Sequence, residues 1–375
     1  MHSNTCDINI MTTEDKKFMH IALNYAKRTV GLTAPNPSVG CIIVKNNQII
    51  GVGNTAQGGR PHAETVALAM AADKAEGAIA YVTLEPCCHY GKTPPCAKAL
   101  IDAGISKVVI ATKDPYEKVA GGGIKMLQKA GIEVVTGVLE QKARQVNAGF
   151  LSVQELGRPY VTLKLATSTD GMIAKNDGKQ LWLTGDIAKS YSHMLRAKND
   201  AIMVGSGTVI ADTPSLDCRL PGMADQSPIR IIMDGRGRYA QEGKLRVGKG
   251  ADIDADPHDL AIVLNKLAEK GITRLLVEGG SALATSFLKA DLIDELIWIK
   301  APITIAKDGL PAFLHMDIAD IENCKKNVIP SKAKDIFYKI LHYAQNDKTN
   351  IKNCSFSLES HLMLGEDEVR VYRKV

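Results

Sequence analysis

The spacing of hydrophobic residues along the chain switches repeatedly between the period of a helix and that of a strand. After Thr13, which we expect to be the N-cap of a first helix, apolar residues recur at three- and four-residue intervals until about Gly31. Residues 41–44 and 48–50 are apolar and flank Lys45-Asn46-Asn47, a pattern that predicts two strands joined by a tight turn. These patterns indicate a mixed α/β fold.

Helices and strands continue to alternate up to about residue 150. The pattern predicts helices over 62–75, 95–103 and 123–130 and from Glu140, and strands over 79–84, 107–111 and 133–135. Such alternation is typical of a sheet that is covered by helices on both faces. We therefore expect a first domain, residues 12–152, that folds as an α/β/α sandwich.

A second series of elements begins after the periodicity breaks near residues 149–159. Its predicted strands cover 160–166, 201–204, 229–233 and 275–277, and its predicted helices cover 187–198 and 260–270, with another helix after Glu278-Gly279-Gly280. The stretch between Asp234 and Leu260 is polar and rich in glycine, and we predict no apolar strand there. A chain of 375 residues is long enough for two domains, and we expect the second to span 157–375.

Composition and charge narrow the class of protein. Hydrophobic residues make up 45% of the chain and charged residues 23%, as in an ordinary soluble globular protein. The net charge of +5 is spread along the sequence, which argues against a nucleic-acid partner. No apolar run approaches the roughly 20 residues of a membrane helix. Eight cysteines are too few for a disulfide scaffold in a chain of this length, so we expect a cytoplasmic protein.

Three residues in the first half form a pattern typical of a catalytic zinc site. His62 stands at the predicted start of a helix, and Cys87 and Cys96 each follow a proline and open another helix, so we expect all three residues at helix N-termini. The positive end of a helix dipole lowers the pKa of a thiol, and the thiolate is the form that binds zinc. One imidazole and two thiolates leave a tetrahedral ion with an open position for a water molecule, whose pKa zinc lowers to about 7.

Hydrolytic deamination also requires a group that takes a proton from water and returns it to the departing nitrogen. Glu64, two residues after His62, is the candidate for this role. His-x-Glu followed by Pro-Cys is a signature of zinc nucleoside and nucleobase deaminases. The alternative is a purely structural zinc site or a few buried cysteines. We expect Cys88, the neighbour of Cys87, to be a bystander.

The segment from Thr83 to Cys96 resembles one family closely. It reads Thr-Leu-Glu-Pro-Cys-Cys-His-Tyr-Gly-Lys-Thr-Pro-Pro-Cys, and every fixed position matches the pattern of the deaminase of bacterial riboflavin biosynthesis. Ala34-Pro35-Asn36-Pro37 is similar to a second motif of that family, and Tyr116 stands where the family usually has Asn. The resemblance implies a cytidine-deaminase-like fold and a substrate pocket lined by Asn36, His89, Lys92 and Thr93.

The second half contains weaker motifs. Glu278-Gly279-Gly280 joins a predicted buried strand to a helix whose free N–H groups can bind a phosphate, although a plain tight turn would have the same sequence. The order of the motifs from Lys164 to Gly280 resembles the reductase domain that is fused to the same deaminase. That reductase is similar to dihydrofolate reductase in fold and uses NADPH. The resemblance therefore implies a second α/β domain of this kind with NADPH as its cofactor.

The resemblance also assigns site residues in the second domain, position by position. The residues implied to hold NADPH are Ala166, Trp182, Thr208, Asp212, Gly235, Gly280, Ser281, Ala282, Leu283, Ala284, Thr285 and Ser286. Those implied to hold substrate are Lys164, Gln180, Arg196, Leu216, Arg219 and Glu278. Arginine binds phosphate bidentately, but an exposed arginine also forms ordinary surface ion pairs. Lys164 lies on a predicted buried strand and needs a partner, for which Asp212 and Glu278 are candidates.

These observations lead to the hypothesis of a bifunctional enzyme of riboflavin biosynthesis. It would use Zn²⁺ to hydrolyse the 2-amino group of a diaminopyrimidinone ribosyl phosphate, and then NADPH to reduce the ribosyl unit to ribityl. One alternative is a deaminase of another nucleobase or of a tRNA base with a non-catalytic second domain. Another is a zinc-stabilised binding module. The resemblance also implies a homo-oligomer, and we expect no nucleic-acid or membrane partner.

Overall fold

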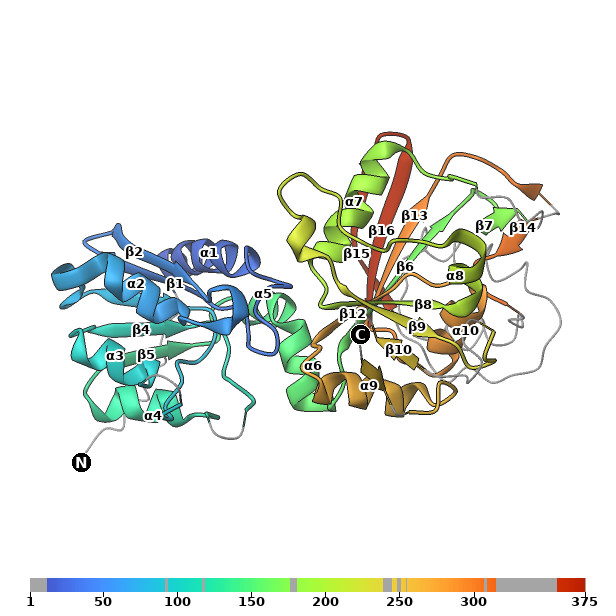
Figure 1. Cartoon of the computed structure of the whole chain (residues 1–375). Coiled ribbons are helices and arrows are strands. Elements are labelled where there is room, and N and C mark those ends of the chain that lie inside the picture. The colour runs from blue at the N-terminus through green and yellow to red at the C-terminus, as the bar shows by residue number, and fades with distance from the viewer. Residues whose placement is uncertain are drawn as a thin grey trace, which may run out of the picture. The chain divides into compact units, whose positions relative to one another are not determined.

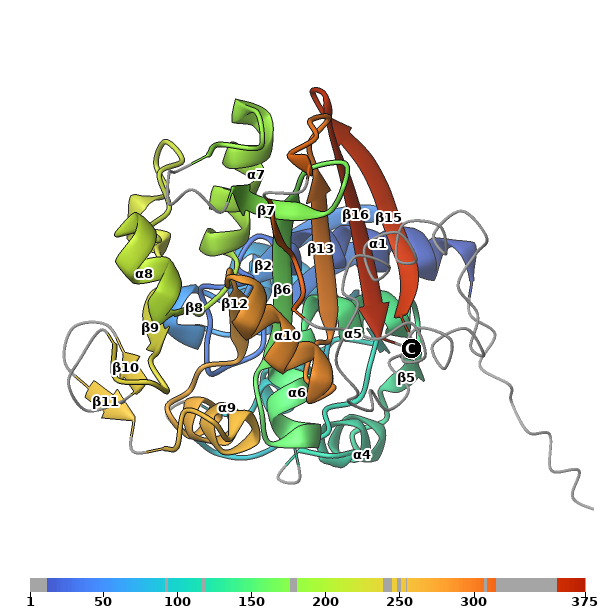
Figure 2. The same cartoon turned by 90° about the vertical axis from the view of Figure 1, so that its right-hand side faces the viewer.

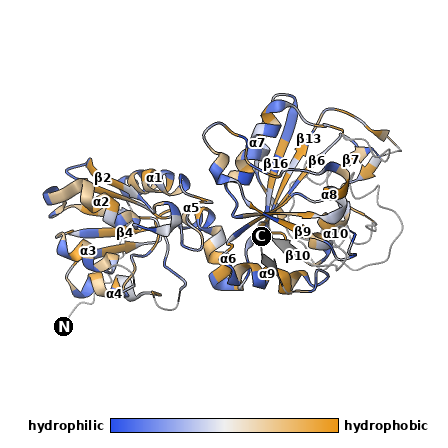
Figure 3. Cartoon of the chain, viewed as in Figure 1, coloured by the Kyte–Doolittle hydropathy of each residue, from blue (hydrophilic) through white to orange (hydrophobic). Residues whose placement is uncertain are grey.

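The structure is a computed structural model that describes residues 12–91, 94–116, 119–175, 181–238, 245–247, 251–253, 255–306, 309–314 and 356–374. The chain divides into two compact units, one ending at Gly157 and the other beginning at Arg158 (Figure 1). Each unit has a sheet with hydrophobic residues packed on both of its faces, and hydrophobic segments occur in strands and helices of both units (Figure 3).

The first unit contains a five-stranded sheet. Its strands are β1 (Gly40–Lys45), β2 (Gln48–Asn54), β3 (Ile79–Val82), β4 (Lys107–Ile110) and β5 (Glu133–Thr136), in the order β2-β1-β3-β4-β5. Strand β1 is antiparallel to both of its neighbours, whereas β3, β4 and β5 are parallel. Asn46 and Asn47 form the turn between β1 and β2 with φ values of 51° and 60°, a conformation that asparagine tolerates well.

Helices cover both faces of this sheet, as the sequence predicts. They are α1 (Thr13–Lys27), α2 (Ala63–Ala71), α3 (Cys96–Asp102), α4 (Gly122–Lys129), α5 (Glu140–Val146) and α6 (Ala148–Leu156), with 3₁₀ turns η1 (Gln57–Gly59) and η2 (Ala72–Ala75). Alternate residues of β1 face opposite layers. Cys41 and Ile43 pack with α2, α3 and α4, whereas Ile42 and Val44 pack with α1 and α5.

Several predicted boundaries in the first unit differ from the structure. Thr12, not Thr13, caps α1, because its hydroxyl accepts a hydrogen bond from the Asp15 N–H at 3.0 Å while the Asp15 carboxylate accepts one from the Thr12 N–H at 3.1 Å. Helix α2 ends at Ala71 and continues only as η2. Helix α6 occupies most of the predicted break and ends where Gly157 adopts a φ of 68°.

The second unit contains a nine-stranded sheet. Its order is β11-β10-β9-β8-β12-β6-β13-β16-β15, and the strands from β9 to β13 are parallel. The strands are β6 (Tyr160–Thr167), β8 (Ala201–Gly205), β9 (Ile229–Met233), β10 (Leu245–Val247), β11 (Ala251–Ile253), β12 (Arg274–Val277), β13 (Glu295–Lys300), β15 (Phe356–Leu364) and β16 (Asp367–Lys374). A separate pair consists of β7 (Met172–Lys175) and β14 (Gly309–Pro311). Strands β10 and β11 lie in the polar stretch for which we predicted no strand.

Helices again cover both faces of the sheet (Figures 1 and 2). They are α7 (Asp186–Ala197), α8 (Ser206–Asp212), α9 (Leu260–Glu269) and α10 (Ser281–Lys289), together with the 3₁₀ turn η3 (Ala224–Gln226). Ala201 and Met203 of β8 pack with α9 and α10, whereas Ile202 and Val204 pack with α7. Because β8 and β12 are parallel neighbours, α8 and α10 begin at the same edge of the sheet.

Candidate functional site

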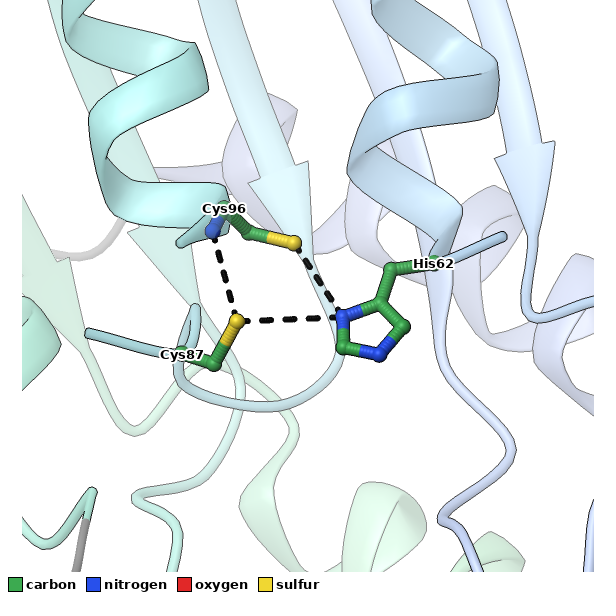
Figure 4. A group of neighbouring side chains, drawn as sticks. All are labelled: His62, Cys87 and Cys96. Carbon is green, nitrogen blue, oxygen red and sulfur yellow. Dashed lines mark hydrogen bonds between the residues drawn. The ribbon is translucent and has the colours of Figure 1, made fainter. Parts of the chain in front are cut away.

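Three side chains from distant parts of the first unit meet at one point (Figure 4). His62 is the N-cap of α2, and Cys96 is the first residue of α3. The prediction that Cys87 also opens a helix is wrong, because Cys87 lies in the loop between β3 and α3. Their ligand atoms all lie within 4.8 Å of one another. The Nδ1 atom of His62 is 3.3 Å from the Cys96 Sγ and 3.7 Å from the Cys87 Sγ. A tetrahedral zinc ion holds nitrogen and sulfur ligands about 3.5 Å apart, so the three residues fit this metal.

The electrostatic environment favours a thiolate at Cys87. A hydrogen bond from the Cys96 thiol, followed by those from the His62 ring and the Cys96 backbone, lowers the pKa of Cys87 to about 4. The backbone N–H of Cys96 donates to the Cys87 Sγ at 3.3 Å. The first turn of α3 thus stabilises the form of Cys87 that binds a metal ion.

Glu64 lies beside these residues in the first turn of α2. Its side chain is almost inaccessible, with 4% of the residue exposed. Burial raises the pKa of Glu64 to about 7, and the negative charge of Cys87 contributes in the same direction. A carboxyl group with this pKa can accept a proton and return it at neutral pH.

Close packing of α2 on β2 holds His62 and Glu64 in place. A Cβ atom at Gly53 would lie 2.2 Å from the backbone oxygen of Ala63, so the strand can approach the helix only because residue 53 is glycine. Ala63 and Ala67 are fully buried in the same contact. The metal-binding end of α2 is therefore fixed by backbone packing.

Two of the four residues predicted to line the deaminase pocket are described by the structure. The side chain of Asn36 lies directly against Gly59, where a Cβ atom would come within 2.1 Å of its amide nitrogen. The Nδ1 atom of His89 is buried and has no hydrogen-bond partner within the described parts of the chain. Lys92 and Thr93 lie outside the described residues.

The second unit contains a largely buried cluster of charged groups around Glu278, directly after β12. Arg196 of α7 donates to its carboxylate through Nε at 2.9 Å and through Nη2 at 3.1 Å, and the Nζ of Lys164 lies 3.6 Å away. Burial alone would raise the pKa of Glu278, but Lys164 and Arg196 outweigh it and hold this pKa below its ordinary value. Of the two partners considered for Lys164, Glu278 is the one that the structure places beside it.

The other residues predicted to hold substrate have different surroundings. Leu216 is buried, with a φ of 56°. Arg219 is exposed and pairs with Asp217 at 3.1 Å. This is the surface ion pair that the sequence allows as an alternative to phosphate binding. Arg196 donates to the backbone oxygen of Asp217 at 3.1 Å, so the two arginines lie near the same residue. Gln180 lies outside the described residues.

Residues predicted to hold NADPH gather where α8 and α10 begin. A Cβ atom at Gly280, the N-cap of α10, would lie 3.5 Å from the hydroxyl oxygen of Thr208 in α8. Because Gly280 has no side chain to cap the helix, the first N–H groups of α10 have no side-chain acceptor at the N-cap and can bind a phosphate. This cradle fits a dinucleotide phosphate.

The remaining residues of this set have different surroundings. Ala166 is on β6, Gly235 follows β9, and Asp212 ends α8. Trp182 is 64% exposed, with the Lys189 ammonium 5.2 Å from its ring centroid. In the first two turns of α10, Ala282 and Ser286 are exposed, whereas the buried side chains are Ser281, Leu283, Ala284 and Thr285. Contacts from these four to a cofactor would use backbone groups.

Sequence reasoning did not single out Glu85 or Asp114. Both carboxylates are buried beside the Cys87 loop, and Glu85 accepts three backbone hydrogen bonds. The available signal was a charged residue at the end of a buried strand, directly before Pro86 and Cys87.

Two family models match the chain. The cytidine and deoxycytidylate deaminase zinc-binding region matches residues 12–112, and the RibD C-terminal domain matches residues 159–328. The riboflavin biosynthesis protein RibD of Bacillus amyloliquefaciens is 41% identical over 326 residues, covering 80% of this chain and 88% of that protein. The RibD of Escherichia coli is 39% identical over 329 residues, covering 79% and 90%.

Solved structures are also similar over nearly the whole chain. Form 1 of RibD from Acinetobacter baumannii has a TM-score of 0.78 at 34% identity and covers 96% of this chain and 99% of its own. A diaminohydroxyphosphoribosylaminopyrimidine deaminase/5-amino-6-(5-phosphoribosylamino)uracil reductase from Thermotoga maritima has a TM-score of 0.77 at 30% identity, with the same coverage.

Fold, site and comparisons together define a zinc-dependent deaminase fused to an NADPH-dependent reductase. The chain belongs to the RibD family of bifunctional riboflavin biosynthesis proteins. The predictions of a two-domain α/β fold, of both enzyme classes, and of Zn²⁺ and NADPH as cofactors are confirmed. No helix in the described part of the chain is long and apolar enough to span a membrane.

Proposed function

We propose that residues 12–152 hydrolyse the 2-amino group of 2,5-diamino-6-(5-phosphoribosylamino)pyrimidin-4(3H)-one, and that residues 157–375 reduce the ribosyl side chain of the product to ribityl. The observation that carries the proposal is the convergence of His62, Cys87 and Cys96 beside the buried carboxyl of Glu64. The activities named for the Thermotoga maritima protein support the choice of substrate.

In the deaminase, His62, Cys87 and Cys96 hold zinc, and Glu64 moves protons. Zinc, when bound, lowers the pKa of a water molecule to about 7. The deprotonated form, which is the nucleophile that attacks a ring carbon, is then available at neutral pH. Glu64 accepts the proton of that water and delivers it to the departing amino group, which leaves as ammonia. Asn36, His89, Lys92 and Thr93 hold the pyrimidine and its phosphate.

In the reductase, the chain binds the ring-opened ribosyl unit next to NADPH, which supplies a hydride when bound. Lys164, Arg196 and Glu278 form one face of the substrate site, and Gln180, Leu216 and Arg219 complete it. The N-terminus of α10 binds a cofactor phosphate through its N–H groups. The cofactor also contacts Ala166, Trp182, Thr208, Asp212 and Gly235.

The test is to supply purified protein with zinc and the diaminopyrimidinone phosphate, with and without NADPH, and to identify the products by mass. Without NADPH we expect ammonia and a product in which oxygen replaces the amino nitrogen. With NADPH we expect that product to gain two hydrogen atoms. Ammonia release without NADPH oxidation would restrict the function to the first unit, as in the alternative of a non-catalytic second domain. No reaction with this substrate would overturn the proposal.

We also propose that the protein acts in the cytoplasm as a homo-oligomer, without a nucleic-acid or membrane partner. The modest net charge of +5, spread along the chain, supports the absence of a nucleic-acid partner. Light scattering coupled to size-exclusion chromatography measures the mass of the protein in solution. The mass of a single chain at micromolar concentration would contradict self-association.

A further inference from the structure

A buried carboxylate ties the loop that carries Cys87 to the chain segment after β4. Glu85 is 3% exposed, and its Oε2 accepts hydrogen bonds from the backbone N–H groups of Asp114 at 3.3 Å and Gly121 at 3.1 Å. Its Oε1 accepts a hydrogen bond from the N–H of Ile124 at 3.2 Å. Gly121 is the N-cap of α4 and has no side chain, so Glu85 supplies the acceptors that the helix N-terminus requires.

Asp114 extends this link toward the surface. Asp114 is 8% exposed, and its Oδ1 accepts a hydrogen bond from the Tyr116 backbone N–H at 2.9 Å. Such a bond from a residue to the backbone two positions further on is the mark of an Asx turn, which fixes the local chain direction. The backbone at Tyr116 is therefore held by the same group of hydrogen bonds that begins beside Pro86.

The ring of Tyr116 lies against His89. The two ring centroids are 6.3 Å apart with an interplanar angle of 71°, an edge-to-face arrangement. His89 follows Cys87 by two residues, and its buried Nδ1 has no hydrogen-bond partner among the residues that the structure describes. A buried polar atom without a partner is costly, which points to a ligand that completes the hydrogen bond.

We propose that Tyr116 is a positioning residue for the deaminase: its ring holds the His89 imidazole so that Nδ1 hydrogen-bonds a polar group of the pyrimidine ribosyl phosphate. The proposal rests on the proposed deaminase function. Tyr116 acts through His89 and contributes no group to the reaction itself. The hydrogen bonds that the Glu85 and Asp114 carboxylates accept from backbone N–H groups fix the backbone that carries the tyrosine ring before substrate binds.

The experiment compares the Tyr116→Phe, Tyr116→Ala and His89→Ala proteins and the Tyr116→Ala/His89→Ala double variant, all zinc-loaded and full-length. Phe keeps the ring, so we expect its KM for deamination to stay within about twofold of the parent. Loss of the ring frees His89, and we expect KM to rise about tenfold, the equivalent of one hydrogen bond, with a smaller change in kcat. In the protein that already carries His89→Ala, we expect Tyr116→Ala to cause no further rise in KM.

Tyr25→Ala is the matched control, because Tyr25 is a half-buried tyrosine of α1 in the same unit, and its ring contacts Arg28, the C-cap of that helix. This variant shows the effect of losing a tyrosine ring at a position distant from His89 in the sequence. Zinc content and melting temperature show whether a variant is folded. The proposal is overturned if Tyr116→Ala raises KM equally with and without His89, or if Tyr116→Phe is as impaired as Tyr116→Ala. Absence of deamination in the unaltered protein would instead overturn the proposed function.

Discussion

At the scale of single residues, Glu64 combines a catalytic position with a pKa suited to proton transfer. We expect Glu64→Gln to lower the rate of ammonia release by about 10²- to 10⁴-fold, because the amide cannot accept the water proton. Zinc content should not change, since the glutamate is not a metal ligand. Ammonia assays with parallel metal analysis measure both quantities. Glu76→Gln, at an exposed site of the same unit, should leave both unchanged. Full turnover in Glu64→Gln would contradict the assigned role.

Asp114 provides a residue-scale prediction about pH. Burial, with a smaller contribution from Glu85, raises the pKa of Asp114 to about 6, so the folded protein binds a proton more tightly than the unfolded chain. Ionisation of this buried group therefore lowers stability at neutral pH, by about 3 kcal/mol at most. Asp114→Asn keeps an acceptor for the Tyr116 N–H and removes the charge.

We expect Asp114→Asn to unfold at a higher temperature than the parent at pH 7.5. The difference should shrink as the pH falls below about 6 and vanish below about pH 3, where the parent carboxyl is protonated in both the folded and the unfolded state. Thermal unfolding of the zinc-loaded proteins across this range measures the effect. A difference that does not depend on pH would show that the charge of Asp114 is not its cause.

At the scale of secondary-structure elements, Glu278 joins three of them. It follows β12, accepts hydrogen bonds from Nε and Nη2 of Arg196 on α7, and lies 3.6 Å from the Nζ of Lys164 on β6. Replacing it with Gln leaves two largely buried cations without a counter-charge, which typically costs about 3–5 kcal/mol. We expect Glu278→Gln to lower the free energy of unfolding of the second unit by about this amount.

Both tryptophans of the chain, Trp182 and Trp298, belong to the second unit, so tryptophan fluorescence during denaturant unfolding reports on this unit alone. Glu269→Gln is the matched control. Glu269 pairs with Lys266 at 3.1 Å, but the two side chains are 64% and 44% exposed. Its loss should cost less than about 1 kcal/mol. Equal effects of the two substitutions would show that the Glu278 cluster adds no stability beyond a surface ion pair.

The elements that sequence predicts well are those whose signal is local. The alternation of Cys41, Ile42, Ile43 and Val44 between the two faces of β1 is visible in the order of the residues, because side chains alternate along a strand. Strands β10 and β11 escaped prediction because each has only three residues, which is too few to show a hydrophobic period within a polar, glycine-rich stretch.

The distinction between local sequence signals and contacts made by folding also applies to the functional sites. The spacing of His62, Glu64, Cys87 and Cys96 predicts a zinc deaminase, since that chemistry requires those residue types in one short motif set. The bidentate pair of Arg196 and Glu278 spans 82 positions and depends on the packing of α7 against the sheet. No local pattern encodes such a contact, and the same holds for Glu85 and its backbone partners around Asp114.

At the scale of the whole molecule, the two units have separate hydrophobic cores and bind different cofactors. The clusters around β1 and β4 contain only residues of the first unit, and those around β8 and β12 contain only residues of the second. A ligand that binds only the folded form stabilises the unit that holds it, by about 2.7 kcal/mol at about one hundred times its Kd. Each cofactor should therefore raise the unfolding temperature of the unit that binds it.

Calorimetry of the full chain tests this expectation. Removal of zinc with a chelator should lower the melting temperature of the first unit and abolish ammonia release. The transition followed by tryptophan fluorescence, which belongs to the second unit, should not move. NADPH at about one hundred times its Kd should instead raise the fluorescence transition by about 5–10 °C, because 1 kcal/mol corresponds to about 2–4 °C in a domain of this size. If the chelator shifted both transitions together, the units would unfold as one, and the stability of the reductase would depend on the zinc site of the deaminase.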